Sequence, residues 1–232
     1  MTADRWTDAV RHPLGFGRLL PLGGPGDGAW LTEAAADAAV RRAAAEVPGV
    51  RLGAVRIAPA DPEAVQESVV PPPPGAVPPG ALRLSADFSA TAAEPLPTTA
   101  AGLRRALAAA AVGLGLAVTE IDLRVTDLLE EDAAEAAVVP APRPPSVRES
   151  ADPEGARVTA AALAVPGVDR VTGALSREIH FDAALLRRHV RVEVALADDG
   201  LRAVEVARQV RTAVGAALDD QPTVAVVVTA VG

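Results

Sequence analysis

The string Val-Pro-Gly-Val occurs twice, at Val47–Val50 and at Val165–Val168, and no other feature of the sequence constrains the fold as strongly. In both places a helical pattern of apolar residues leads into the string, and a Pro-Gly pair is a typical helix stop. Thr32 and Asp152 stand where the two helices should begin, and both residue types favour the N-cap position. The repetition therefore predicts that the chain contains two copies of one structural unit.

The rest of each copy follows one order of elements. Alternating apolar and polar residues predict a strand at Leu82–Ser89 and its counterpart at Val190–Ala197. A second helical pattern and a last strand follow, at 98–115 and 120–128 in the first copy and at 200–220 and 223–231 in the second. We expect an α/β fold of the α+β, two-layer kind, with two tandem small domains. Each would be a short mixed sheet with two helices on one face, in the order helix, strand, strand, helix, strand.

The copies differ by a Pro-rich insertion. We assign residues 1–128 to the first repeat, with the insertion at 58–80, and residues 151–232 to the second repeat. Residues 129–150 are acidic and then Pro-rich, which is typical of a linker. Proline lacks a backbone N–H and favours the extended polyproline conformation. We therefore expect the insertion to be exposed and mobile.

Composition excludes several classes of protein. The chain has no Cys, so it has neither disulfides nor a thiol nucleophile, and its formal net charge of −8 opposes binding to nucleic acid by bulk attraction. The first residues do not resemble a secretory signal. The longest near-apolar run, 106–118, is shorter than the ~20 residues that span a bilayer. We expect a cytoplasmic protein. Lys, Asn and Tyr are also absent, while Ala, Arg, Gly and Pro are abundant, which indicates a GC-rich bacterial genome.

The motifs that could carry catalysis are weak. The Gly-rich segment Leu22–Trp30 precedes a helix but lacks the lysine of a phosphate-binding loop, so we interpret it as a turn. His12, His180 and His189 show no metal-ligand or triad spacing, and we interpret the latter two as surface residues with local ion pairs. An activated nucleophile needs an adjacent base. We therefore predict no catalytic, cofactor-binding or metal-binding residues, and no enzyme.

Two sets of residues are candidates for an interaction surface. Arg187, Arg188 and Arg191 form a dense basic cluster, which is either a solvated strand entrance or a contact site for an acidic partner or a lipid headgroup. Val224 and Val227 point to opposite faces of the last strand, and a strand that is apolar on both faces must be covered on both. We expect the first repeat or a partner chain to cover the outer face.

The second repeat, "VRVEVALADDGLRAVEVARQVRTAVGAALDDQPTVAVVVTAV", resembles the alkaline-shock family of envelope stress response proteins of Gram-positive bacteria. The likeness lies in the helix that ends in V-x-G-V, the V-x-V-x-V strand, the helix "EVA-x-x-V-x-x-A-V" and the final β-strand. Glu205, Val206 and Ala207 match that helix, as do Val210, Ala213 and Val214. The chain departs from the family pattern in its "ADDG" turn and in its tandem duplication.

The resemblance implies a non-enzymatic, envelope stress-related or structural protein without a cofactor. It would act by protein–protein interaction near the cytoplasmic face of the membrane. The implied partners are a small membrane-anchored protein, family relatives or further copies of the chain in a homo-oligomer. The resemblance implies no nucleic acid and no membrane span. The order of elements also suits a small lipid- or ligand-binding module, and an enzyme is the third alternative.

Overall fold

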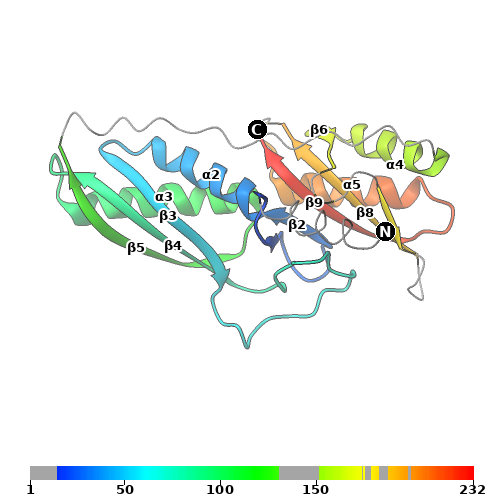
Figure 1. Cartoon of the computed structure of the whole chain (residues 1–232), viewed down its shortest axis with the longest axis horizontal. Coiled ribbons are helices and arrows are strands. Elements are labelled where there is room, and N and C mark those ends of the chain that lie inside the picture. Colours follow the sequence, from blue (N-terminus) through cyan, green and yellow to red (C-terminus); the bar gives the residue numbers. More distant parts are fainter. Residues whose placement is uncertain (1–14, 131–151, 174, 176–178, 183–187, 198–199) are drawn as a thin grey trace, which may run out of the picture.

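The structure is a computed structural model that describes residues 15–130, 152–173, 175, 179–182, 188–197 and 200–232. In these residues, four helices and two β-sheets pack together (Figure 1). The predicted mixed α/β class, of the α+β kind, is therefore confirmed. The predicted linker and the N-terminal segment with His12 lie outside the described residues, apart from residues 129 and 130 at the start of the linker.

Both repeats contain the predicted order of elements. The first part of the chain contains β1 (Leu19–Pro21), β2 (Ala29–Thr32), α2 (Glu33–Ala45), β3 (Val50–Pro59), β4 (Leu82–Thr91), α3 (Leu96–Leu114) and β5 (Val118–Leu129). The second part contains α4 (Pro153–Leu163), β6 (Val168–Val171), β7 (His180–Asp182), β8 (His189–Leu196), α5 (Ala203–Ala216) and β9 (Thr223–Val231). The hairpin β1–β2 and the short strand β7 are additions to the predicted order.

The first helix of each repeat begins at the predicted N-cap. The Thr32 hydroxyl accepts a hydrogen bond from the Ala35 N–H at 3.3 Å, and the Asp152 carboxylate accepts one from the Gly155 N–H at 3.3 Å. These bonds satisfy N–H groups that have no partner inside the helix. The side chains that the sequence offers at these positions thus fix where α2 and α4 start.

The repeat is also visible in the strand pairing. β4 lies between the antiparallel β3 and the parallel β5, and β8 lies between the antiparallel β6 and the parallel β9. Two parallel strands need a crossover between them. Helix α3 provides it between β4 and β5, and α5 provides it between β8 and β9. Both repeats therefore share one topology.

The larger sheet contains strands from both ends of the described chain. Its order is β1-β2-β9-β8-β6, with β7 also paired to β8, and the smaller sheet has the order β3-β4-β5. β2 runs parallel to β9, with Trp30 beside Val227. The division of the chain into domains 1–128 and 151–232 stays a prediction. The ladder between β2 and β9 pairs one strand from each of these two segments.

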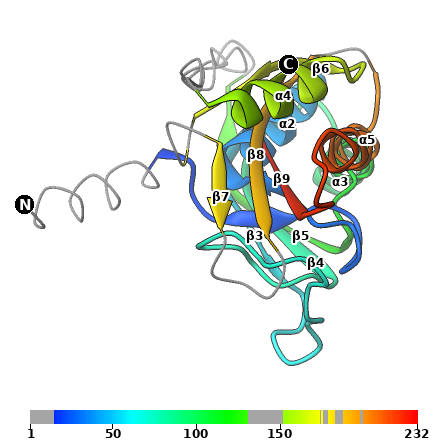
Figure 2. The ribbon, with the colours of Figure 1, turned by 90° about the vertical axis from the view of Figure 1, so that its right-hand side faces the viewer.

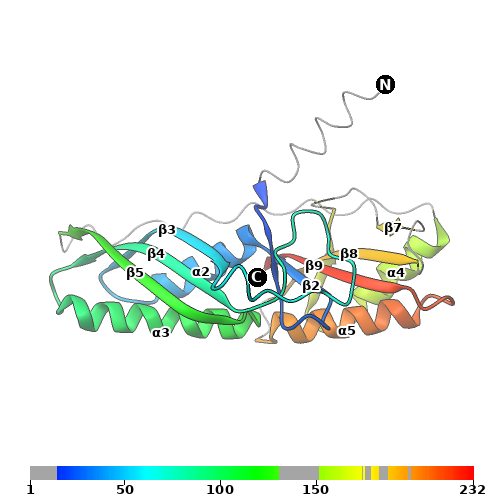
Figure 3. The ribbon, with the colours of Figure 1, turned by 90° about the horizontal axis from the view of Figure 1, so that it is seen from below.

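One hydrophobic core runs under both sheets. The inner faces of the strands point to the helices, and α3 and α5 lie nearly end to end along that side (Figure 3). Gly115 ends α3 in a left-handed conformation with a φ of 86°. A Cβ at this position would lie 2.5 Å from a Val204 methyl group at the start of α5. Glycine is therefore required where the two helices meet.

The Pro-rich insertion packs against the outer face of the larger sheet. Ala76 forms a β-bridge with Leu19, and Val70 and Val77 are buried, as are Pro73 and Pro79. Figure 2 shows the insertion in cyan, away from α3 and α5. The expectation of an exposed tract is wrong for these buried positions. Val70 covers the apolar outer face of the larger sheet, and Val77 belongs to the main hydrophobic core.

Candidate functional site: the buried outer face of the larger sheet

Strand β8 carries the most unusual side chains in the described residues. Its inner face presents Val190, Val192 and Val194 to the core, and its outer face presents His189, Arg191 and Glu193. Charged side chains are almost never fully buried unless they are paired. We name the outer-face residues of β8 and their neighbours on β9, β2 and β1 the outer-face cluster. Its members are Leu19, Trp30, His189, Arg191, Glu193, Ala225 and Val227.

An ion pair lies at the polar side of the outer-face cluster. Arg191 Nε is 3.8 Å from Glu193 Oε1, and the two side chains are 11% and 2% exposed. The Leu175 N–H donates to Glu193 Oε2 at 2.8 Å. Among the described residues, Arg191 Nε finds no hydrogen-bond acceptor. Burial lowers the pKa of Arg191 and the Glu193 charge opposes this shift, but a guanidinium stays protonated throughout.

His189 is held next to this pair. Its Nδ1 is 2.9 Å from the Thr223 hydroxyl. Burial lowers the pKa of His189, while the nearby Asp182 carboxylate raises it and Arg191 lowers it further. His189 is therefore a buried histidine, and the prediction of a surface residue is wrong for it. His180 is exposed, as predicted.

The apolar side of the outer-face cluster lies on β1, β2 and β9. Trp30 and Val227 are neighbours across the ladder, at 1% and 0% exposure, and Leu19 and Ala225 pack with them. Val70 from the insertion closes this side. Within the described part of the chain, the Trp30 indole N–H has no acceptor. The first half of the chain therefore covers the outer face of β9, which is one of the two outcomes expected from its sequence.

Two buried threonines, Thr172 and Thr229, form hydrogen bonds next to the end of β8. The hydroxyls of Thr172 and Thr229 are 2.8 Å apart, and Thr229 Oγ1 donates to the Val194 carbonyl at 3.1 Å. Both residues are buried. These bonds satisfy polar groups that would otherwise be costly to bury.

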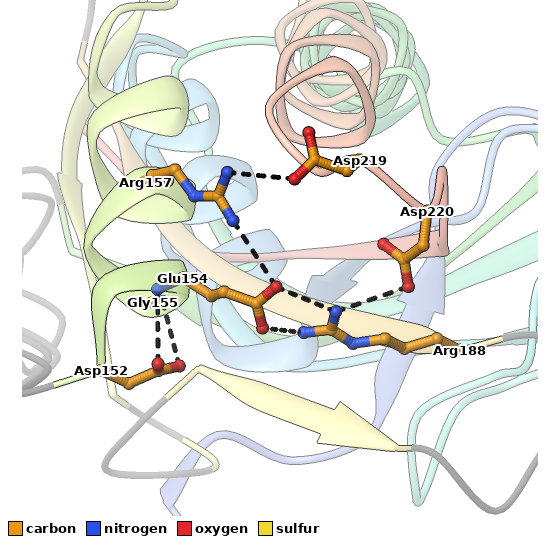
Figure 4. A network of polar contacts seen from close by, with 7 residues as sticks. All are labelled: Asp152, Glu154, Gly155, Arg157, Arg188, Asp219 and Asp220. Atoms are coloured by element: carbon orange, nitrogen blue, oxygen red, sulfur yellow. Dashed lines mark hydrogen bonds and ion pairs between the residues drawn. The ribbon is translucent and has the colours of Figure 1, made fainter.

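A second network of charges lies at the start of α4 (Figure 4). Arg188 bonds Glu154 at 2.5 Å and Asp220 at 3.4 Å. Arg157 contacts Glu154 at 3.6 Å and Asp219 at 3.5 Å. The hydrogen bond from Arg188 lowers the pKa of Glu154 and raises that of Arg188. This network joins α4 to the entrance of β8 and to the turn before β9.

The predicted basic cluster is thus divided between internal networks. Arg188 pairs with carboxylates and lies over the Phe181 ring at 4.7 Å, whereas Arg191 belongs to the buried ion pair. Arg187 lies outside the described residues. The structure does not bring Arg188 and Arg191 together on one exposed patch.

The two predicted valines are buried inside the chain. Val224 faces the helices at 3% exposure, and Val227 lies in the outer-face cluster at 0%. Neither side chain forms an exposed surface. The apolar residues on both faces of the last strand predicted that both faces would be buried. Other segments of the same chain bury both faces.

The Gly-rich segment is a turn, as expected. The Asp27 carboxylate accepts from the Gly24 N–H at 2.7 Å and from Arg208 Nε at 2.8 Å. The hydrogen bond from Arg208 lowers the pKa of Asp27. Arg211 donates to the Gly26 carbonyl. Together these contacts hold the turn against α5, beside a depression of about 550 Å³ lined by that helix.

Sequence reasoning missed Trp30 and Glu193. Glu193 stands in the alternating segment "VRVEVA", which places it on the face opposite the valines, whereas Trp30 stands in "AWLT", which is too short and too apolar to show an alternation. Neither segment indicates that the insertion covers the outer face of the sheet. The burial of this face depends on contacts between distant segments.

Among the residues that the structure describes, no group of three or more His, Asp or Glu residues could hold a metal ion. No described helix combines the length and apolar character needed to cross a bilayer. Comparison with known proteins found no matching family model and no matching curated protein.

Proposed function

We propose that this chain is a non-enzymatic protein that acts by protein–protein interaction, as a structural or stress-related component near the cytoplasmic face of the cell membrane. The observation that supports the interaction role is the open edge of the smaller sheet. In the described residues β5 pairs only with β4, so its other edge has no partner strand (Figure 1). An exposed strand edge is a template for pairing with another chain.

The side chains around this edge fit a contact surface. Val125 and Leu128 on β5 are 41% and 61% exposed, although valine and leucine are usually buried. The outer face of the sheet is polar and carries cross-strand ion pairs, Arg83 with Glu120 at 2.5 Å and Arg124 with Asp87 at 2.7 Å. The edge of β5 therefore presents exposed apolar residues on one face of the sheet and paired charges on the other, and protein–protein interfaces combine residues of both kinds.

The larger sheet is a weaker candidate for such contacts. Its outer face is covered by the insertion, and its most unusual charges are used inside the chain. The smaller sheet is therefore the surface that we assign to partners. The location at the membrane, through a small anchored partner, rests on the resemblance to the alkaline-shock family.

The test is site-specific photo-crosslinking in the source cells. A photo-reactive amino acid at Thr126 on β5 should give adducts with other protein chains, including proteins of the membrane fraction. The matched control is the same amino acid at Arg56, an exposed position on β3. The proposal is wrong if position 126 gives no protein adduct, or no more than position 56 gives.

A ligand-binding role has one observation in its favour, the depression on α5. Arg208 and Arg211 line it, so an anionic small molecule or lipid headgroup would suit it. Asp27 already neutralises Arg208, which weakens this alternative. Isothermal titration calorimetry with anionic vesicles would detect such binding, and Arg211→Gln should abolish the binding. Lack of any heat signal would remove the alternative.

A further inference from the structure

The unpaired edge of β5 contains one regular segment. The ladder between β4 and β5 shifts register between Leu82 and Arg83 and again between Phe88 and Ser89. Between these shifts, residues 120–125 of β5 follow β4 without interruption. Ile121, Leu123 and Val125 share the inner face, and Asp122 and Arg124 share the outer face. This segment can accept another strand without a change of its backbone.

The other edges of the described sheets are less suitable. β3 is interrupted by a register shift between Leu52 and Val55, and Arg41 donates to the Leu52 and Gly53 carbonyls at 3.4 and 2.9 Å. The strands at the edges of the larger sheet have three or four residues each. Bulges, short strands and covering side chains are the usual ways to block an edge. Among the described residues, one such contact lies on the regular segment of β5, from Arg104 Nε to the Ile121 carbonyl at 3.4 Å.

We propose that β5 pairs antiparallel with β5 of a second molecule of this chain, about a twofold axis at Leu123. The pairing rests on the proposed interaction role and names its partner and its surface. In this register Leu123 lies opposite its own copy and Ile121 lies opposite Val125. Asp122 lies opposite Arg124, twice by symmetry. The two three-stranded sheets become one six-stranded sheet.

Of the twofold axes at Asp122, Leu123 and Arg124, the one at Leu123 makes the sequence of β5 self-complementary. A twofold axis at Asp122 or at Arg124 would place like charges directly opposite each other, which is destabilising. The axis at Leu123 instead places apolar residues together on the inner face and opposite charges together on the outer face. Side chains of Asp122 and Arg124 are 66% and 75% exposed, so both can reach across the new ladder while they keep their contacts within the chain.

The closest test is disulfide trapping. The chain has no Cys, so Leu123→Cys introduces a single thiol. Residues directly opposite in an antiparallel pair are close enough for a disulfide. Mild oxidation should therefore trap a Leu123→Cys dimer. Ile121→Cys alone and Val125→Cys alone should not form dimers, but a mixture of the two should form the mixed disulfide.

Charge reversal gives an independent test that does not depend on oxidation. Arg124→Asp should weaken self-association measured by sedimentation roughly tenfold or more, because two attractive pairs become repulsive, and so should Asp122→Arg. Mixing the two variants should restore association, because each mixed pair is again of opposite charge. Circular dichroism and thermal unfolding of each variant confirm that it is folded.

Any one of three results would overturn the self-pairing. The first is a parent chain that stays monomeric by sedimentation at high concentration. The second is a trapped dimer whose cysteine pattern does not favour Leu123, and the third is a pair of charge variants that do not complement each other. Adducts to other proteins from position 126, together with a monomeric purified chain, would contradict the self-pairing and leave the proposed interaction role in place.

Discussion

Replacing one partner of the buried Arg191–Glu193 ion pair should lower the free energy of unfolding far more than replacing both partners together. Glu193→Gln keeps the size of the side chain and an oxygen that can accept from the Leu175 N–H, but it leaves the Arg191 charge in a site that is only 11% exposed. Removal of one partner of a buried pair costs about 3–5 kcal/mol. The contact is loose, at 3.8 Å, and Arg191 is not fully buried. We therefore expect Glu193→Gln to lower the free energy of unfolding by about 3 kcal/mol.

The matched controls are Arg191→Met and the double variant. Arg191→Met removes the Arg191 cation from the buried Glu193 carboxylate, so it should also be strongly destabilised. The double variant buries no charge and should lie within about 1 kcal/mol of the parent. Urea unfolding followed by circular dichroism gives all four free energies and hence the coupling between the two sites. Single variants within about 0.5 kcal/mol of the parent, or a double variant less stable than both, would refute this account.

Three further predictions concern other contacts. Val227→Asp should lower the free energy of unfolding by about 3 kcal/mol or more, because it places an unpaired charge in the outer-face cluster. A thermal unfolding midpoint equal to that of the parent would contradict the burial of Val227. Gly115→Ala should cost roughly 2 kcal/mol by denaturant unfolding, from its left-handed backbone and from overlap with Val204, and a neutral effect would mean that α3 and α5 do not meet. Hydrogen bonding to Arg208 lowers the pKa of Asp27, so the carboxylate contributes stability above the ordinary aspartate pKa of about 4 and loses it as pH falls through the folded value. The stability difference between the parent and Asp27→Asn should therefore shrink below about pH 4, and a difference independent of pH would show that this ion pair contributes nothing.

The elements that the sequence predicted well are those whose signals are local. The N-caps at Thr32 and Asp152 depend on a side chain and an N–H three residues away, and the last strand, 223–231, is marked by its own run of valines. Alternation also predicted the strand β8, whose alternate valines face the core. These features need no knowledge of the rest of the chain.

The elements that the sequence did not predict depend on distant partners. The hairpin β1–β2 has short strands of three and four residues, and β2 is stabilised as a strand by its pairing with β9. The burial of Val70 and the pairing of Arg191 with Glu193 follow from the same arrangement. Proline content alone indicated an exposed insertion, because composition carries no information about which surface lies beneath it.

The ladder between β2 and β9 also sets an order of events during synthesis. The Thr32 hydroxyl donates to the Thr229 carbonyl, a contact between positions 197 residues apart. Translation proceeds at about 5–20 residues per second, so β2 leaves the ribosome on the order of ten seconds or more before its partner strand exists. Throughout that interval the indole of Trp30 and the edge of β2 have no β9 to cover them. The nascent first half therefore exposes an apolar side chain and an unpaired strand edge, which are features that chaperones bind and that favour aggregation.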